Sequence, residues 1–387
     1  MTPPFWLTLL LGFLTAVGPV STDMYLPAFP AITAEFHGPA QITLAAWFAG
    51  LAVGQITQGS LSDRLGRRAP LLFGTSLYAL ASAGCALAPD LGWFSAWRVL
   101  AAFGGSAGMV VPRAIVRDLA DGHAAARMLS RLVLIMGVVP ILAPALGGAV
   151  LTIAGWRVIF WAATFYGALC TVLVWAWLPD TLPETRRLKL GLGGIVARYA
   201  QVARERSFLT NALAGGLATT ALFVYLAGSP TAFIVQYRVS PSHYGMLFGL
   251  NAAGYIAGSQ LCARVLPRFG TNAVLRTAVR ALVLASCALM IDAATGFGGV
   301  AGLVLPLFAC LASTGFIMPP AVVGALSRHA AHAGSASALM GTGQFGLAAL
   351  GGLAVGALSD GTARPMAALM LVSACLAGIA DLYRPRS

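Results

Sequence analysis

Long apolar runs, separated by short polar or turn-rich breaks, fill most of the 387-residue chain. A helix needs about 20 mainly apolar residues to cross the hydrocarbon core of a bilayer, so each run predicts one transmembrane helix. Cutting the chain at its breaks predicts twelve spans, at residues 5–30, 41–62, 69–88, 93–116, 128–153, 157–178, 208–235, 242–266, 272–292, 298–327, 334–358 and 364–383. The pattern therefore predicts an all-α membrane protein with twelve transmembrane helices.

One polar stretch, residues 179–207, is longer than the other breaks and divides the spans six and six. The two halves resemble each other when the chain is shifted by 204 residues, which pairs Gly54 with Gly258, Gly66 with Gly270, and Gly137 with Gly341. Parallel repeats that enclose a site near the middle of the membrane are a transporter architecture. We therefore expect two pseudo-symmetric six-helix bundles, at 1–178 and 208–387, joined by a cytoplasmic linker at 179–207.

The composition supports lipid as the main solvent. Hydrophobic residues make up 58% of the chain and charged residues only 9%, whereas soluble domains carry roughly 25% charged residues. The six cysteines lie inside apolar runs without a CxxC pair, so we expect small buried side chains and neither a disulfide nor a metal site. The first run lacks a basic leader and a cleavage site, which favours a retained first span over a signal peptide.

Charge predicts the orientation of the chain. With the N-terminus inside, 20 of the 24 basic residues fall in cytoplasmic segments or the helix ends next to them; the exceptions are Arg98, Arg157, Arg238 and Arg364. This asymmetry follows the positive-inside rule. The net charge of +12 therefore indicates contact with the membrane surface rather than binding of nucleic acid. The asymmetry also predicts a multi-pass inner-membrane protein with both termini cytoplasmic.

A charged, glycine-containing segment, GSLSDRLGRR at residues 59–68, lies between the second and third spans. Gly59 and Gly66 permit a tight turn and a close approach of helices. The segment also contains Arg64 and Arg67. Asp63 can act at a helix end and pair with a basic residue, and so form a cytoplasmic latch that a conformational change breaks. The alternative interpretation is a positive-inside loop that contains a turn.

A second segment, GVVPILAPALGG at residues 137–148, lies in the fifth span. Its prolines, Pro140 and Pro144, and its glycines, which begin with Gly137, predict a kinked helix with a flat face. Either a hinge or simple close packing explains this pattern.

These segments resemble those of the major facilitator superfamily, whose signature loop has the form of residues 59–68. Residues 137–148 resemble the antiporter motif of its drug exporters, although Ala143 stands where that motif has glycine. Residues 21–30 (STDMYLPAFP) and 113–118 (RAIVRD, which includes Arg117 and Asp118) resemble the bicyclomycin- and chloramphenicol-resistance (Bcr/CflA) branch. The resemblance implies proton-driven export of drugs. In the second copy of the loop, Pro267 stands where Asp63 is expected, so any latch is asymmetric.

Two ionisable residues lie within spans. Asp23 is the acid that we place deepest, and an ionisable group at that depth is costly and by default functional. The alternative is a carboxylate at the end of the span, wetted from outside. Arg98, near the outer part of the fourth span, is the matching cation, and in the resembled exporters an arginine there belongs to the cavity; the alternative is an arginine that reaches the interface. We expect both residues to serve proton coupling.

Polar and aromatic residues at depth are candidates for the substrate cavity. Each polar residue alone is equally consistent with a hydrogen bond between helices. The candidates are Tyr25, Trp47, Phe48, Tyr225, Asn251 and Gln344, with Phe223 and Phe345 as further apolar lining.

Proton-coupled antiport of a mostly apolar small molecule fits these residues best, because sugars need denser hydrogen bonding. A proton-coupled exporter of a metabolite, such as an amino acid or a sugar, is the alternative transporter. An enzyme is disfavoured because the chain has no Walker loop, GxSxG or HExxH, and the repeat and Asp23 favour transport over a receptor or structural protein. We expect a monomer that binds substrate, protons and lipid, with no cofactor.

Overall fold

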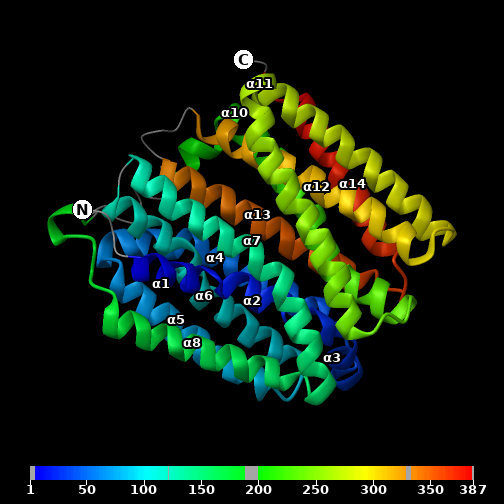
Figure 1. Ribbon diagram of the computed structural model, residues 1–387, viewed down its shortest axis with the longest axis horizontal. Coiled ribbons are helices and arrows are strands. Elements are labelled where there is room, and N and C mark those ends of the chain that lie inside the picture. The colour runs from blue at the N-terminus through cyan, green and yellow to red at the C-terminus, as the bar shows by residue number, and fades with distance from the viewer. Residues whose placement is uncertain (1–4, 121, 188–198, 328–332, 386–387) are drawn as a thin grey trace.

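The computed structural model describes residues 5–120, 122–187, 199–327 and 333–385, and every regular element within these ranges is a helix. The first half contains α1 (Phe5–Thr15), α2 (Val17–Asp23), the 3₁₀-helix η1 (Leu26–Ala28), α3 (Phe29–Phe36), α4 (Gln41–Leu65), α5 (Arg68–Ala86), α6 (Leu91–Leu119), α7 (Gly122–Ile153) and α8 (Arg157–Trp177). After the short η2 (Glu184–Arg186), the second half contains α10 (Arg206–Pro230), the π-helix η3 (Thr231–Gln236), α11 (Pro241–Thr295), α12 (Gly299–Leu326), α13 (Ala333–Ala357) and α14 (Arg364–Leu382). Figure 1 shows the long helices of both halves running between the same two ends of the molecule.

Twelve segments of the described chain cross the bundle. Ten stretches of helix are long and apolar enough to span a membrane. The 55-residue α11 supplies one crossing more, because its helical backbone is interrupted at Gly270. The 25-residue α4 supplies the last, and its hydropathy is lowered by polar side chains in its final turns. The predicted all-α, twelve-helix fold is therefore confirmed.

Glycines at equivalent positions of the two halves make equivalent contacts. Gly50 and Gly54 of α4 pack against α6, where a Cβ on Gly54 would overlap the hydroxyl oxygen of Ser106. Gly254 and Gly258 of α11, 204 residues further along the chain, pack against α12. Small residues allow transmembrane helices to approach closely. Both halves therefore use the same stripe of glycines for the same helix pair.

The turns that follow these helices are equivalent as well. Gly66 has φ 88° and ψ 176°, and Gly270 has φ 76° and ψ 158°. This region of backbone conformation is open almost exclusively to glycine. The backbone thus requires both glycines that the 204-residue shift pairs.

The first span is longer and less regular than its apolar pattern predicted. We expected it to end near residue 30, but helical segments continue to Phe36, with breaks after Thr15 and after Asp23. Proline removes a hydrogen bond and its ring clashes with the carbonyl four residues earlier. Pro19 and Pro27 place those clashes at residues 15 and 23, where the breaks occur.

Two helix pairs, α4 with α13 and α7 with α11, provide most of the contact between the halves. At the end of the molecule that carries α3 in Figure 1, Nε2 of Gln41 donates to the hydroxyl of Thr231 over 3.1 Å. At the same end Gly148 packs against the carbonyl of Pro241, where a Cβ would lie 2.5 Å from that oxygen. The two halves are therefore in close contact at the end opposite the first and last described residues.

A buried ionic cluster fixes the end of α14. Asp381 and Arg384 are each 5% exposed at the side chain, and Nη2 of Arg384 lies 2.8 Å from Oδ1 of Asp381. Arg384 also donates to Oδ1 of Asn272 over 2.6 Å, and Nε of Arg276 lies 3.6 Å from Asp381. The cluster thereby ties the segment of α11 that follows Gly270 to the end of the described chain.

All six cysteines are free thiols, but the expectation that every one is buried was wrong. Two lie on helix faces turned toward the surroundings of the bundle, where an apolar environment suits a thiol as well as a protein interior does. Cys85, Cys170, Cys262 and Cys310 are buried, Cys287 is half-buried and Cys375 is exposed.

Candidate functional site

Asp23 is a buried acid at the break in the first span. It is the last residue of α2, and 4% of it is exposed. Within the described ranges, no basic side chain lies within ion-pair distance of it. The free carbonyls at a helix C-terminus give that end partial negative charge. The carboxylate form of Asp23 therefore has little electrostatic compensation from its surroundings.

The same residue lies at the junction of the two halves. The 3₁₀-helix η1, which begins at Leu26 three residues after Asp23, packs against α10 and α11 of the second half. The carbonyl of the next residue, Met24, packs directly against Gly147 of α7, where a Cβ would overlap it. The break in the first span thus brings Asp23 beside helices of the second half.

Arg98 lies inside the first half, held mainly by aromatic rings. It is 2% exposed, and its guanidinium carbon lies 4.4 Å from the ring centroids of both Tyr25 and Trp47. Nη2 donates to the carbonyl of Ser21 over 3.0 Å, whereas Nε has no hydrogen-bond partner in the part of the chain that the structure describes. A buried cation over two ring faces gains cation–π stabilisation. Arg98 is therefore tied to the first span through Ser21 and Tyr25.

Asp23 and Arg98 do not pair. Arg98 bonds to the backbone two residues before Asp23, and the pocket beside it, with a volume of about 10 Å³, is lined by Ser21, Tyr78 and Ser82 among others. The hydroxyls of Ser21 and Tyr78 lie 2.6 Å apart. A polar cavity of this volume is about large enough for one water molecule. The sequence suggested that Arg98 offsets the charge of Asp23, but the structure shows no direct contact that does so.

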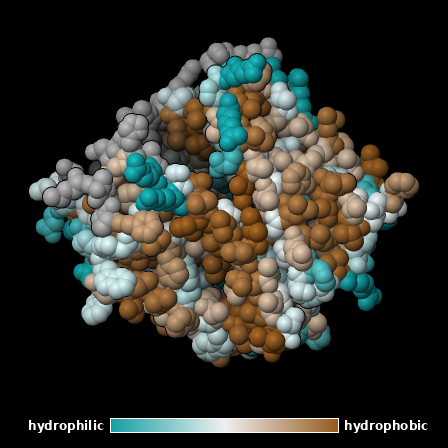
Figure 2. All heavy atoms as spheres, viewed as in Figure 1, coloured by the Kyte–Doolittle hydropathy of each residue, from teal (hydrophilic) through white to brown (hydrophobic). Residues whose placement is uncertain are grey.

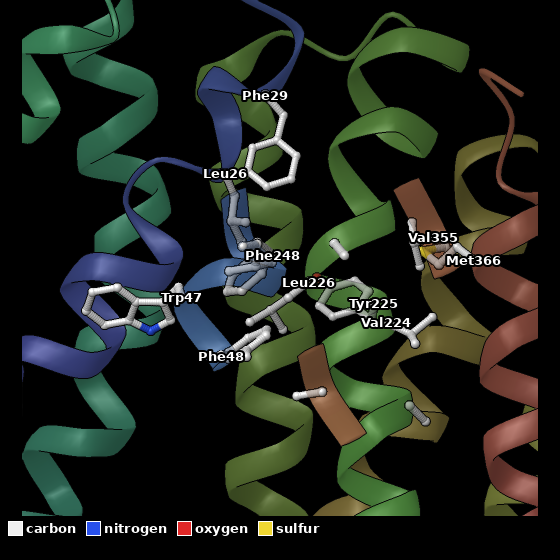
Figure 3. Packing of buried hydrophobic residues seen from close by; sticks show 14 of the residues in the cluster. Leu26, Phe29, Trp47, Phe48, Val224, Tyr225, Leu226, Phe248, Val355 and Met366 are labelled. Carbon is white, nitrogen blue, oxygen red and sulfur yellow. The ribbon is translucent and has the colours of Figure 1, made fainter. Parts of the chain in front are cut away.

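The six predicted cavity residues do not form a single group. Tyr25 and Trp47 belong to the aromatic cluster around Arg98, and the hydroxyl of Tyr25 lies 3.2 Å from that of Thr43. Phe48 follows Trp47 in α4 but points the other way, toward α10 and α11, as Figure 3 shows. The structure therefore does not bring Tyr25 and Trp47 together with the candidates from the second half.

Phe48 belongs to an aromatic cluster between the halves. Its ring centroid lies 4.4 Å from that of Phe223 and 6.2 Å from that of Phe345, and these two rings lie 5.8 Å apart. The rings come from α4, α10 and α13. This cluster is a candidate apolar wall of the substrate site.

The polar candidates of the second half bond to one another or to neighbouring helices. Nδ2 of Asn251 donates to the hydroxyl of Tyr225 over 3.3 Å, and the rings of Tyr225 and Phe248 stack with centroids 5.5 Å apart. Nε2 of Gln344 donates to the hydroxyl of Thr219 over 3.1 Å. These contacts fit the expected role as hydrogen bonds between helices and leave Oδ1 of Asn251 without a partner within the described residues.

The turn after α4 contains an ionic network centred on Arg67. Nη1 of Arg67 lies 2.6 Å from Asp63, Nε lies 2.7 Å from Asp118 at the end of α6, and only 5% of the arginine side chain is exposed. The backbone N–H of Arg67 donates to Asp180 over 2.8 Å, and Asp180 also pairs with Arg187 over 3.0 Å. The network thus links α4, α6 and the start of the polar stretch that divides the halves.

The other residues of the two predicted motifs lie outside this network. Arg64 and Arg117 are exposed, and Gly59 lies near Val110 of α6. In α7, Pro140 and Pro144 lie within a continuous helix, while Gly137 faces Ile256 of the other half. The helix that carries the prolines is therefore one of those that join the two halves.

The sequence did not identify several residues of these clusters. Asp180 is 113 residues from Arg67, Ser21 is 57 residues from Tyr78, and Phe248 is one of many aromatic residues in apolar runs. Contacts at such separations leave no local pattern in a single sequence. One signal was present for Ser21, because it lies in the segment of residues 21–30 that contains Asp23.

Comparison with known proteins places the chain in a family. The sequence model described as Major Facilitator Superfamily matches residues 11–352. An uncharacterized MFS-type transporter, YdgK of Bacillus subtilis, is 36% identical over 379 residues, 97% of this chain and 94% of that protein. The bicyclomycin resistance protein homolog of Haemophilus influenzae is 29% identical over 381 residues, 96% of this chain and 94% of that protein.

The fold also matches solved structures. A bacterial homolog of the human lysosomal transporter Spinster superimposes with a TM-score of 0.74 at 16% identity, over 98% of this chain and 95% of that one. At this identity the likeness shows the fold alone. It agrees with the two pseudo-symmetric bundles that the repeat predicts.

Proposed function

The chain belongs to the major facilitator superfamily of membrane transporters, and we propose that it exports small, mostly apolar drug-like molecules in exchange for protons across the bacterial inner membrane. Phenicol- and bicyclomycin-type antibiotics are the proposed substrates. The observation that carries this proposal is Asp23, a buried acid without a basic partner in the described chain, in the break of the first span just before η1 packs against α10 and α11 of the second half.

The surroundings of the junction favour an apolar substrate. Phe48, Phe223 and Phe345 form an aromatic cluster between the halves. Aromatic surfaces with few polar groups suit amphipathic molecules, and a small number of polar groups fixes their orientation. Tyr225 and Asn251 supply such groups nearby. A bicyclomycin resistance protein homolog among the relatives supports the same substrate class.

Proton coupling follows from the charge of Asp23. A carboxylate inside a membrane protein is costly unless it is paired or hydrated. Protonation removes that charge, so the protonated and charged forms favour different arrangements of the helices around the first span. A substrate that binds beside Asp23 competes with its proton, which links export of the substrate to entry of a proton.

Two other sites control the change between arrangements. The Arg67 network ties α4, α6 and Asp180 together, so we assign it the role of a latch. Gly147 and Gly148 bring α7 into contact with Met24 and Pro241, and we assign the proline-containing segment of α7 the role of a hinge between the halves. Arg98 holds the first span in register through Ser21.

We also propose the orientation and domain limits. The bundles comprise residues 1–178 and 208–387, the linker at 179–207 and both termini are cytoplasmic, and the transporter acts as a monomer. Residues 188–198 of the linker lie outside the described residues. Glu184 is exposed, so a cysteine introduced there should react with an impermeant maleimide only from the cytoplasmic side. Labelling of the wild-type protein measures the background reaction of the native thiols.

Drug efflux by reconstituted protein tests the proposed function. Proteoliposomes with an imposed pH gradient should accumulate chloramphenicol or bicyclomycin against the concentration gradient of the drug. Collapse of the pH gradient should abolish the accumulation. Cells that lack other exporters should gain resistance to the same compounds. Gradient-driven transport of an amino acid or a sugar, without transport of either drug, would replace this substrate class with the metabolite alternative.

A further inference from the structure

A large apolar groove runs along the outer side of the first half, between α1, α2, α7 and α8. Its volume is about 1090 Å³, at or above the upper end of the roughly 300–1,000 Å³ of pockets that hold drug-sized ligands. Figure 1 shows α1 and α2 on the viewer's side between α7 and α8. On this face in Figure 2, hydrophobic side chains cover much of the middle and hydrophilic ones gather toward the edges.

The lining of the groove offers almost no hydrogen bonds. Of its sixteen residues, only Tyr166, Trp6 and Trp177 carry a side-chain O–H or N–H group. The hydroxyl of Tyr166 already donates to the carbonyl of Phe13. Water in a cavity needs several polar partners, and an empty cavity forfeits the dispersion contacts of its lining. The groove therefore suits a flexible hydrocarbon chain.

The groove has one end at the membrane surface. Trp6 lies at the start of α1 and Trp177 at the end of α8, on the side of the molecule where the described chain begins. Tryptophan is enriched at the level of lipid headgroups. From Trp6 to Met24 the first span rises roughly 25 Å at about 1.5 Å per residue, which exceeds half of the ~30 Å hydrocarbon core. A complete acyl chain from one leaflet fits along this length.

Positive charge lies at the same end. The guanidinium carbon of Arg131 is 5.1 Å from the ring centroid of Phe5, the residue before Trp6. Arg131 is exposed and stands one helical turn before Ile135, which lines the groove. Arg127, one turn earlier in α7, is exposed as well. Basic side chains near the membrane surface attract the phosphate of anionic lipids.

We infer that this groove binds an anionic phospholipid, with one acyl chain between α1, α2, α7 and α8 and its phosphate on Arg131. The far end of the chain then contacts Val20 and Met24, which also line the small pocket beside Arg98. The bound lipid thus supports the first span along the groove.

Native mass spectrometry of the full-length protein in mild detergent tests this site. The probe is phosphatidylglycerol added in mixed micelles. Leu142→Trp fills the groove, and Leu134→Trp is the matched control, because both leucines are exposed on α7 (52% and 66%) but only Leu142 lines the groove. Wild type and Leu134→Trp should each retain one phosphatidylglycerol. In Leu142→Trp the fraction of protein with bound phosphatidylglycerol should fall at least about fivefold. Leu146→Trp, a second groove-filling variant, guards against misfolding of the first.

The headgroup contact has its own control. Arg131→Gln should lower retention of phosphatidylglycerol about fivefold and lower retention of phosphatidylethanolamine less, because the ammonium group of that lipid already offsets the charge of its phosphate. Arg280→Gln removes another exposed arginine, on α11, and should change neither. Equal retention by Leu142→Trp, Leu146→Trp and Leu134→Trp would contradict the acyl-chain site, and equal losses in the two arginine variants would contradict the phosphate contact.

Discussion

Arg67 and Asp118 form a two-bond ion pair that ties the turn after α4 to the end of α6. Nε of Arg67 donates to one carboxylate oxygen over 2.7 Å and Nη2 to the other over 3.2 Å. Such bidentate pairs fix orientation as well as adding energy. Asp63 lies 2.6 Å from the same guanidinium, so two carboxylates from different helices share one nearly buried cation.

Asp63→Asn should therefore slow transport while leaving substrate affinity close to wild type. The substitution removes one of the two carboxylate charges that pair with Arg67 and leaves the junction around Asp23 unchanged. It therefore alters the balance between conformations rather than the substrate site. Turnover in proteoliposomes and substrate binding in detergent measure the two effects separately. Asp360→Asn, which changes an exposed acid between α13 and α14, is the control. Normal turnover of Asp63→Asn would mean that residues 59–68 only set the orientation of the chain in the membrane and form no latch.

Asp381→Asn should destabilise the protein strongly. Asp381 and Arg384 are each 5% exposed at the side chain, and removal of one partner of a buried ion pair costs roughly 3–5 kcal/mol. Glu184→Gln, in a pair whose glutamate is 87% exposed, should cost less than about 1 kcal/mol. Melting temperatures of the two variants in the same detergent compare these costs. Equal melting temperatures would show that the cluster at the end of α14 does not hold the fold together.

Arg98→Ala should impair transport, and Arg98→Lys should restore it only in part. The guanidinium stacks on Tyr25 and Trp47 and donates to Ser21, and a lysine ammonium lacks the planar surface for both contacts. Export rates of the two variants at equal amounts of folded protein test this. Full activity of Arg98→Lys would mean that positive charge alone is required there.

The sequence predicted the fold because lipid imposes a simple pattern. Apolar runs had to form spans, and Gly66 and Gly270 had to be glycine because of their backbone conformations. The boundaries were harder to predict. The first span continued to Phe36 because Pro19 and Pro27 break the helix without ending the membrane segment, and polar side chains masked the end of α4.

The site was less predictable than the fold. Hydropathy identified Asp23 and Arg98 as buried, since both interrupt apolar runs, but it did not reveal that Arg98 bonds to Ser21 rather than to Asp23. Trp47 and Phe48 are neighbours in sequence and both apolar, yet they face opposite sides of α4. Side-chain direction depends on the packing of helices that are distant in sequence, and a single sequence does not contain that information.

Asp23→Asn should abolish export driven by a pH gradient while preserving substrate binding. The amide is close in size to the carboxyl group but binds no proton, so binding should also lose its dependence on pH. Thr15→Val, which removes another buried hydroxyl of the first span that donates to the backbone carbonyl of Leu11, is the matched control and should retain coupled export.

Proton release on substrate addition tests the central claim most directly. Wild-type protein in weakly buffered detergent should release protons when chloramphenicol or bicyclomycin is added, because the substrate displaces the proton on Asp23. The Asp23→Asn protein should bind the same compound and release none. If the Asp23→Asn protein still releases protons and still confers resistance in cells, Asp23 is not the coupling site.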